Sequence, residues 1–274
     1  MQIVRDASGL ADFSGGVLVP TMGALHAGHM ALIERAAALA GEGGGDIVVS
    51  LFVNPTQFND PSDFERYPRS LEDDARKCEA AGVACLFAPD VGAVYPRGVE
   101  SAPESALPRV ATAPGLEDRF RPGHFAGVCA VVSRLFELTR PRAAVFGEKD
   151  WQQLCVIRAM VERAGGKIEI EPCPTVREAD GMALSSRNAL LSADARRRGL
   201  SIWRGLEAAQ VETDPPAAER AMRRMMEVGG VEVEYAAVRD AATLEAVRPG
   251  RPARALAAGV VGGVRLIDNM PWGV

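Results

Sequence analysis

The chain has 274 residues, of which 47% are hydrophobic and 24% are charged. This composition is that of a globular protein with a substantial core, and it excludes a mostly disordered chain. The net charge of -5, from 31 basic and 36 acidic residues, gives no general attraction to nucleic acid or to a membrane surface.

Alternating patterns predict a parallel sheet covered by helices through the first two thirds of the chain. The segments that predict strands are residues 17–19, 46–53, 84–87, 143–146 and 167–171. The helical patterns follow His29 and recur at residues 71–81, 125–138 and 152–163. Residues 95–114 are rich in proline and small polar residues, which favours an irregular surface segment.

The composition changes after Val176. Arginines cluster between residues 187 and 204, Pro215-Pro216 indicates a break, and residues 231–238 alternate like a strand with one solvated face. We therefore expect a domain boundary near Thr175, with domains at residues 1–175 and 176–274.

The cysteines and the apolar segments indicate the cellular compartment in which the protein is expected. The five cysteines are odd in number and lie mostly in apolar patterns, which predicts buried thiols rather than a disulfide framework. No basic region followed by an apolar stretch opens the chain, and no uninterrupted apolar segment is long enough to span a bilayer. We expect a cytoplasmic protein.

Two of the three histidines, His26 and His29, lie between the first predicted strand and the helix after it. Unpaired backbone N–H groups at a helix start, together with the helix dipole, favour a bound phosphate. Imidazole N–H groups would add donors, and Gly23 and Gly28 would let the backbone approach a ligand. A zinc site is the alternative, but no further histidine lies nearby and the chain has no Cys-x-x-Cys.

Three other segments carry polar groups that suit a ligand. Lys149 and Asp150 follow a predicted strand, and ligands bind at the carboxyl ends of strands in open α/β sheets. Residues 184–188 read Leu-Ser-Ser-Arg-Asn and offer hydroxyls and a guanidinium to phosphates. Asn54 and Gln57 follow a central strand as donors for a small polar substrate. Each segment alone is equally compatible with a solvated ion pair or a polar turn.

Together these segments resemble the pantothenate synthetase family, the ATP-dependent ligases of pantoate and β-alanine. The resemblance rests on residues 20–26, 52–58, 147–150, 177–181 and 185–188, and extends to 67–69, 123–128 and 264–269. It is weakest over residues 211–254. It implies an α/β fold with a Rossmann-like, doubly wound parallel sheet and a smaller C-terminal α+β lid domain. Residues 1–175 would then bind ATP and pantoate, residues 176–274 would form the lid, and the protein would be a homodimer.

The resemblance also implies a reaction and a set of site residues. The pantoate carboxylate would attack the α-phosphate of ATP to give pantoyl adenylate and pyrophosphate, and β-alanine would then displace AMP. The catalytic groups would be His26, His29, Lys149, Ser185, Ser186 and Arg187. The residues that contact ATP would be Met22, Gly23, Ala24, Leu25, His26, Ala27, Gly28, His29, Gly147, Glu148, Lys149, Asp150, Val176, Leu184, Ser185, Ser186 and Arg187. Gln57 and Gln153 would hold pantoate, and Mg²⁺ would accompany the triphosphate with help from Asp73 and Asp74.

One departure from the family pattern and two alternative functions remain. The family usually has Leu-Ala-Met before Ser-Ser-Arg, whereas this chain has Met182-Ala183-Leu184, a swap of side chains of similar volume. A nucleotidylyltransferase acting on a phosphate-bearing acceptor would share the paired histidines but would need an additional basic cluster. A noncatalytic nucleotide-binding protein would bind ATP without forming pyrophosphate.

Overall fold

The computed structural model describes residues 1–57, 64, 70–99 and 102–273, and its contacts divide the chain into two compact units. The first unit contains Met1–Glu148 and Val156–Pro174, and the second contains Lys149–Cys155 and Thr175–Val274. Helix α7 (Trp151–Arg163) therefore begins among residues of the second unit and ends among those of the first. Phe58 and the Tyr67-Pro68-Arg69 segment, which belong to the family resemblance, lie outside the described residues.

The first unit is built on a six-stranded parallel sheet in the order β1-β4-β3-β2-β5-β6. Its strands are β1 (Gln2–Val4), β2 (Val17–Thr21), β3 (Ile47–Leu51), β4 (Cys85–Phe87), β5 (Ala143–Gly147) and β6 (Glu169–Cys173). From β2 the chain moves through β3 and β4 toward one edge, and it then returns to place β5 on the other side of β2. The reversal makes the neighbouring strands β2 and β5 the switch point of a doubly wound sheet. The expected α/β fold class is confirmed.

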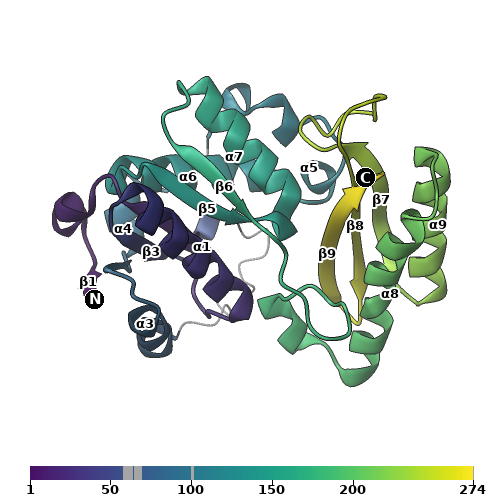
Figure 1. Ribbon diagram of the computed structural model, residues 1–274, viewed down its shortest axis with the longest axis horizontal. Helices are drawn as coiled ribbons and strands as arrows, with labels where there is room; N and C mark the ends of the chain where they lie inside the picture. The colour runs from purple at the N-terminus through teal and green to yellow at the C-terminus, as the bar shows by residue number, and fades with distance from the viewer. Residues whose placement is uncertain (58–63, 65–69, 100–101, 274) are drawn as a thin grey trace. The chain divides into compact units, whose positions relative to one another are not determined.

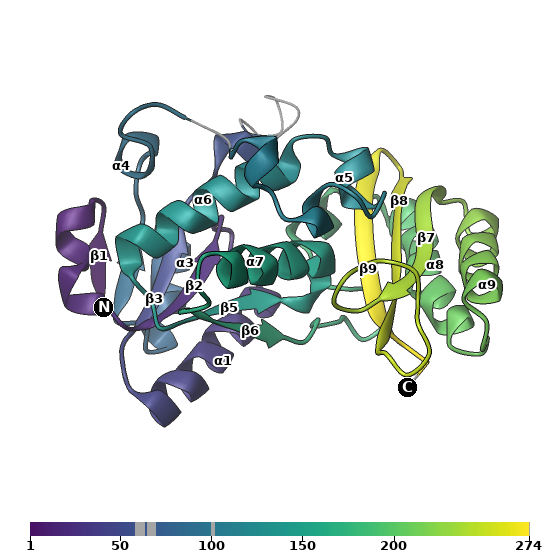
Figure 2. The ribbon, with the colours of Figure 1, turned by 90° about the horizontal axis from the view of Figure 1, so that it is seen from above.

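Helices cover both faces of this sheet. Figure 2 shows α1 (Ala27–Gly43) on one side and α6 (His124–Thr139) on the other. Because successive side chains of a strand point to opposite faces, Val17 and Val19 of β2 share one face, where they pack in the same core as Ile33 of α1. Helix α3 (Leu71–Ala80) adds Cys78 to this core. The core holds the carboxyl ends of the central strands in fixed register.

Short helices lie in the connecting segments of the first unit. They include η1 (Ala7–Phe13), η2 (Pro55–Gln57), α4 (Val91–Val94), η3 (Glu104–Ala106), η4 (Arg109–Ala111) and α5 (Glu117–Phe120). The segment expected to be irregular contains η3 and η4 within its described part. The elements predicted for this unit agree with the structure to within a few residues. Strand β6 spans Glu169–Cys173 and so lies two residues later than the predicted strand at residues 167–171.

The second unit contains a three-stranded antiparallel sheet in the order β7-β8-β9, with two helices packed against it (Figure 1). The elements are α8 (Ala193–Ala209), α9 (Pro215–Val228), β7 (Glu232–Asp240), β8 (Ala253–Val261) and β9 (Val264–Trp272). Leu206 and Met222 of the helices are fully buried in one core with Ala255 and Ala257 of β8. The antiparallel sheet with its helices confirms the smaller α+β part of the predicted fold class.

The double proline in this unit, expected to mark a break, begins a helix. Pro215 and Pro216 occupy the first turn of α9, behind the N-cap Asp214. Proline is suited to that turn because its missing N–H would have no partner within the helix. In the part of the chain that the structure describes, no helix is both long and apolar enough to cross a membrane.

Candidate functional site

The turn between β2 and α1 carries both histidines at the switch point. His26 is the N-cap of α1, and its Nδ1 accepts the N–H of Gly28 at 3.1 Å. His29 Nδ1 accepts the N–H of His26 at 3.3 Å, so the two side chains form a capping box with ring centroids 4.1 Å apart. Because both Nδ1 atoms accept, each neutral imidazole carries its proton on Nε2. Each ring is therefore an Nε2–H donor.

Helix α3 holds this turn through Asp74. The carboxylate is 1% exposed, and its two oxygens accept the N–H groups of Ala24 and Leu25, each at 2.8 Å. One turn later on α3, Lys77 donates to the carbonyl of Leu25 at 2.7 Å. The turn needs such support because Ala24 has a φ of 52°, a left-handed conformation that costs a residue with a Cβ about 1–2 kcal/mol.

These contacts correct one expectation about phosphate binding. We expected unpaired N–H groups at the start of α1, but those of His26 and Gly28 have acceptors within the protein, as do those of Ala24 and Leu25 in the turn before the helix. The N–H groups of Ala24 and Leu25 bind the Asp74 carboxylate, and those of His26 and Gly28 bind imidazole nitrogens. A phosphate at this turn would therefore be held by side-chain donors rather than by these backbone groups.

The two aspartates expected beside Mg²⁺ have other partners. Asp73 pairs with Lys77 at 2.6 Å and with Arg76 at 3.1 Å on α3, and Asp74 binds the turn. Among the described residues, no group of three or more His, Cys, Asp or Glu side chains could hold a metal ion. The residues present therefore do not fit a protein-built Mg²⁺ site.

The segment after β3 separates Asn54 from Gln57. Asn54 is 1% exposed, its Nδ2 donates to the carbonyl of Gly127 at 3.3 Å, and its Oδ1 accepts the Tyr95 hydroxyl at 3.0 Å. We expected Asn54 to be a substrate donor, but this buried amide is satisfied inside the protein and joins η2 to α6. Gln57 is partly exposed, and Arg121 donates to its carbonyl at 3.2 Å. Gln57 is thus the residue of this pair whose side chain remains a candidate for substrate.

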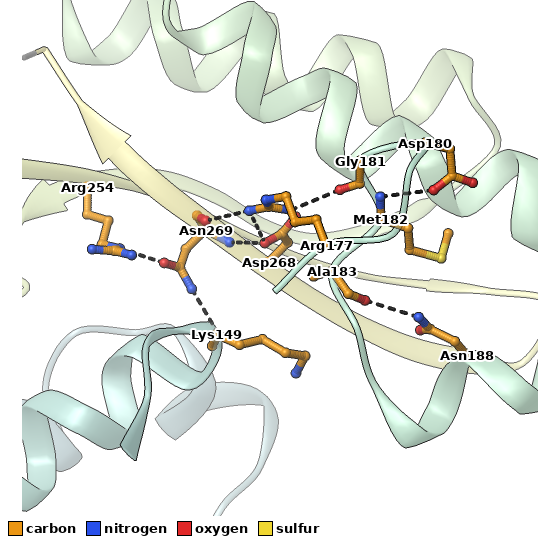
Figure 3. Close-up of polar contacts among 10 residues, drawn as sticks. All are labelled: Lys149, Arg177, Asp180, Gly181, Met182, Ala183, Asn188, Arg254, Asp268 and Asn269. Atoms are coloured by element: carbon orange, nitrogen blue, oxygen red, sulfur yellow. Dashed lines mark hydrogen bonds and ion pairs between the residues drawn. The ribbon is translucent and has the colours of Figure 1, made fainter. Parts of the chain in front are cut away.

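Lys149 lies in the short helix η5 (Glu148–Asp150), between Gly147 at the end of β5 and helix α7. Its side chain is 17% exposed, and Nζ lies 3.7 Å from Asp150. Asn269 of β9 donates from Nδ2 to the carbonyl of Lys149 at 2.8 Å (Figure 3). Gln153, the expected pantoate ligand of the second unit, is partly exposed on the first turn of α7.

The segment before the Ser-Ser-Arg motif is fixed by Arg177. Its guanidinium donates to both oxygens of Asp268, at 2.7 and 2.9 Å, and to the carbonyl of Gly181 at 3.0 Å (Figure 3). It also stacks over the ring of Trp203 at 4.1 Å. Burial raises the pKa of Asp268, and the hydrogen bonds and charge of Arg177 oppose that shift.

The Ser-Ser-Arg motif itself forms the start of η6 (Ser186–Leu190). Ser185 is the N-cap and accepts the N–H of Arg187 at 3.3 Å, while the Arg187 side chain is exposed. Asn188 donates to the carbonyl of Ala183 at 3.0 Å and to Glu178 at 3.0 Å, which ties η6 to the preceding segment. Val176 and Leu184 are adjacent, because the N–H of Leu184 donates to the carbonyl of Val176 at 2.9 Å.

Each unit thus brings part of the predicted site together. The turn after β2 gathers residues 22–29, and the second unit places Lys149, Asp150 and Gln153 on consecutive turns and Ser185 to Arg187 on η6. Sequence reasoning named Asp74 only as a helper for Mg²⁺, and Asp268 and Asn269 only within the family resemblance, so it missed that these three residues fix the segments. Their available signal was weak: acidic or amide side chains that interrupt otherwise apolar patterns.

Comparison with known proteins agrees with this geometry. A profile of the family described as Pantoate-beta-alanine ligase matches residues 3–271. The pantothenate synthetase of Rubrobacter xylanophilus is 49% identical over 265 residues, covering 92% of this chain and 89% of the relative. The crystal structure of pantothenate synthetase from Thermus thermophilus superimposes with a TM-score of 0.89 at 40% identity, covering 98% of this chain and 99% of that one. A pantoate-beta-alanine ligase from Francisella tularensis, complexed with beta-gamma ATP and beta-alanine, gives a TM-score of 0.79 at 31% identity, with 99% and 97% covered.

Proposed function

Because the chain belongs to the pantoate-beta-alanine ligase family, we propose that it condenses (R)-pantoate with β-alanine to pantothenate in an ATP-dependent reaction. A pantoate carboxylate oxygen attacks the α-phosphorus of ATP, and the bond to the β-phosphate oxygen breaks to release pyrophosphate. The β-alanine nitrogen then attacks the acyl carbon of pantoyl adenylate and displaces AMP. The Francisella tularensis relative, complexed with beta-gamma ATP and beta-alanine, supports this choice of substrates.

The observation that carries the proposal is the histidine capping box at the switch point. It fixes the tautomer of both rings, so His26 and His29 offer Nε2–H donors at the carboxyl end of β2. Adenylation builds negative charge on the phosphate oxygens as pyrophosphate departs, and preorganised donors stabilise that charge without reorganising during the reaction. We assign His26 and His29 to this role, with His26 as the proton donor of the family pattern.

The remaining assignments follow the family pattern. Lys149, Ser185, Ser186 and Arg187 would complete the set that stabilises the triphosphate, and residues 22–29, 147–150, 176 and 184–187 would contact ATP. Gln57 and Gln153 would hold pantoate, and Gln57 would also meet β-alanine. The second unit would act as a lid that keeps water from the adenylate, whose activated acyl carbon would otherwise hydrolyse.

Mg²⁺ would arrive with ATP as part of the substrate. The triphosphate supplies oxygen ligands of the kind that Mg²⁺ prefers, and Mg²⁺ commonly binds through substrate phosphates rather than an all-protein cage. Binding of Mg²⁺ through the triphosphate agrees with the contacts of the two aspartates, because Asp73 pairs with Lys77 and Asp74 accepts from Ala24 and Leu25. No step of the proposed chemistry is assigned to a protein-bound metal.

We further propose a cytoplasmic homodimer. All five cysteines are buried thiols, as suits a protein in a reducing compartment. The dimer rests on the family resemblance. Sedimentation at micromolar concentration is the measurement for it, and a single species of monomer mass would refute it.

The reaction order provides the decisive experiment. With ATP, Mg²⁺ and pantoate but without β-alanine, the enzyme should exchange labelled pyrophosphate into ATP, because adenylation precedes the need for the amine. Omitting pantoate should abolish exchange. Exchange that requires β-alanine would contradict a separate adenylate. Mass spectrometry of the products identifies a nucleotidylyltransferase, which would attach the nucleotide to a phosphate-bearing acceptor, and a noncatalytic ATP-binding protein would form no product.

A further inference from the structure

We propose that Asn269 is a positioning residue for Lys149, an inference that rests on the proposed role of Lys149 at the triphosphate. The Asn269 side chain is 3% exposed, and its amide accepts one hydrogen bond and donates another. Oδ1 accepts from Nε of Arg254 at 2.5 Å, and Nδ2 donates to the carbonyl of Lys149 at 2.8 Å (Figure 3).

The orientation of this amide is determined by its neighbours. A guanidinium has donors and no acceptor, so the oxygen of Asn269 must face Arg254. The amide nitrogen must then face the Lys149 carbonyl. Aspartate has the same shape but two acceptor oxygens. It would accept from Arg254, but its second oxygen would repel the Lys149 carbonyl oxygen.

Arg254 is itself held in place. It is 5% exposed, and its guanidinium lies 3.5 Å from the centroid of the Trp151 ring. Trp151 donates from Nε1 to the carbonyl of Ala241 at 2.9 Å. The first residue of α7 and the backbone of Lys149 are thus braced together against β8 and β9, because a stacked cation and a buried amide both resist displacement.

The same strand also holds the segment that leads to the Ser-Ser-Arg motif. Asp268, the neighbour of Asn269, binds Arg177 through both oxygens, and Arg177 also donates to the carbonyl of Asn269 at 3.2 Å. Two adjacent residues of β9 therefore fix the Lys149 turn and the Arg177 segment of the same unit.

This brace matters because the lysine side chain is long. Its ammonium lies at the end of a flexible four-carbon stem, so the direction of the stem depends on the peptide plane that Asn269 holds. A misplacement of about 1 Å in a catalytic group can lower the rate about a hundredfold. Asn269 would therefore act on the reaction through Lys149, without contact with substrate.

Asn269→Asp tests the donor directly, because it keeps the size of the side chain and the acceptor for Arg254 but removes the N–H to Lys149. We expect pantoate-dependent pyrophosphate exchange to fall about tenfold or more. Gln210→Met is the matched control, because Gln210 also donates from a side-chain amide to a carbonyl of β9, that of Pro271 at 2.9 Å, away from Lys149. The control should leave exchange unchanged.

A double-mutant cycle separates positioning from general destabilisation. In a Lys149→Ala background, Asn269→Asp should change the remaining pyrophosphate exchange by less than about twofold, because the lysine side chain that Asn269 positions is gone. Equal losses in both backgrounds would overturn the proposal. If Asn269→Asp does not fold, Asn269→Ser takes its place, because a hydroxyl is too short to reach both partners and the same outcomes apply.

Hydrogen–deuterium exchange provides a readout that does not depend on activity. The backbone amides of the peptide covering residues 147–155 should take up deuterium faster in Asn269→Asp than in the wild type. Unchanged deuterium uptake in this peptide would also overturn the proposal. Absence of pantoate-dependent pyrophosphate exchange in the wild-type protein would instead refute the proposed function, and the deuterium measurement would still decide whether Asn269 holds the Lys149 turn.

Discussion

The carboxylate of Asp74 accepts the backbone N–H of Leu25 at 2.8 Å, which joins helix α3 to the turn that carries His26. Its second oxygen binds the N–H of Ala24. The geometry of the histidine pair therefore depends on a residue from a much later part of the chain. This dependence makes Asp74 a sensitive site for substitution.

Asp74→Asn should destabilise the protein by about 1–3 kcal/mol, because an amide nitrogen cannot accept and leaves one buried N–H without its partner. Urea denaturation measures the change, and pyrophosphate exchange should fall with it because the histidines lose their support. Asp73→Asn is the control, since the Asp73 side chain is only half-buried and pairs with neighbours on its own helix. Equal stability of the two variants would show that the Asp74 contacts contribute nothing.

His26→Asn separates helix capping from catalysis. Asparagine is among the best N-cap residues, so the free energy of unfolding should stay within about 1 kcal/mol of the wild type. The Nε2–H donor is lost, and removal of one preorganised donor lowers turnover by about a hundredfold or more. Steady-state kinetics and thermal unfolding on the same samples provide the comparison. Near-normal turnover in the folded variant would remove His26 from the mechanism.

Gln57→Ala should raise the concentration of pantoate needed for exchange far more than that of ATP. Gln57 lies in η2 after β3, whereas the histidines follow β2, so the proposed contacts to pantoate and to ATP come from different segments. Loss of a hydrogen-bonding partner leaves a polar group of the substrate unpaired. Isothermal titration with each substrate checks this, and weakened ATP binding with unchanged pantoate binding would contradict our division of the site.

Native cysteines should react slowly with a thiol reagent at pH 8. Burial raises the pKa of Cys78, Cys85 and Cys129 to about 11. Only about one thiol in a thousand is then ionised at that pH, and the thiolate is the reactive form. The absorbance change with an aromatic disulfide should report slow reaction in buffer and five fast-reacting thiols in guanidinium. Fast reaction of these three in the native state would contradict their burial.

Met182→Leu combined with Leu184→Met restores the usual family order. Met182 is buried, and its sulfur accepts from Arg196 at 2.7 Å. Arg196 also binds Glu178 and Asp180, and sulfur is a weak acceptor, so the double swap should cost less than about 1.5 kcal/mol. Chemical denaturation measures this cost. A large change in ATP affinity would show that the order is a specificity feature.

Much of the first unit follows from local sequence patterns. Near-continuous apolar runs such as residues 47–51 are typical of strands buried on both faces, which identifies parallel strands, and the His26 turn follows an apolar run. The paired strands β8 and β9 could not be predicted in this way. Strand β8 consists largely of alanine and valine, and β9 mixes apolar, charged and amide side chains. The hydrogen bonds that tie β9 to Lys149 and Arg177 join positions that are far apart in the chain.

The candidate site shows the same division. Residues proposed to act through their own chemistry, such as His26 and Lys149, stand out by type and by place after a strand. Residues that act by holding others do not, because Asp74 and Asn269 acquire their partners only when distant segments meet. Asn54 shows the converse error, since its amide has the right chemistry for a ligand but is satisfied by Tyr95 and Gly127.

Strand β6 forms one edge of the six-stranded sheet, and its composition bears on how the protein behaves at high concentration. A bare strand edge exposes backbone donors and acceptors that another chain can pair with. Here the edge carries Glu169, Glu171 and Pro172, and Glu171 binds Arg35 of α1 at 2.6 Å. Proline offers no N–H to an incoming strand, and the exposed carboxylate of Glu169 repels a second copy of the same edge. The strand that completes the sheet thereby also protects the protein against edge-to-edge aggregation.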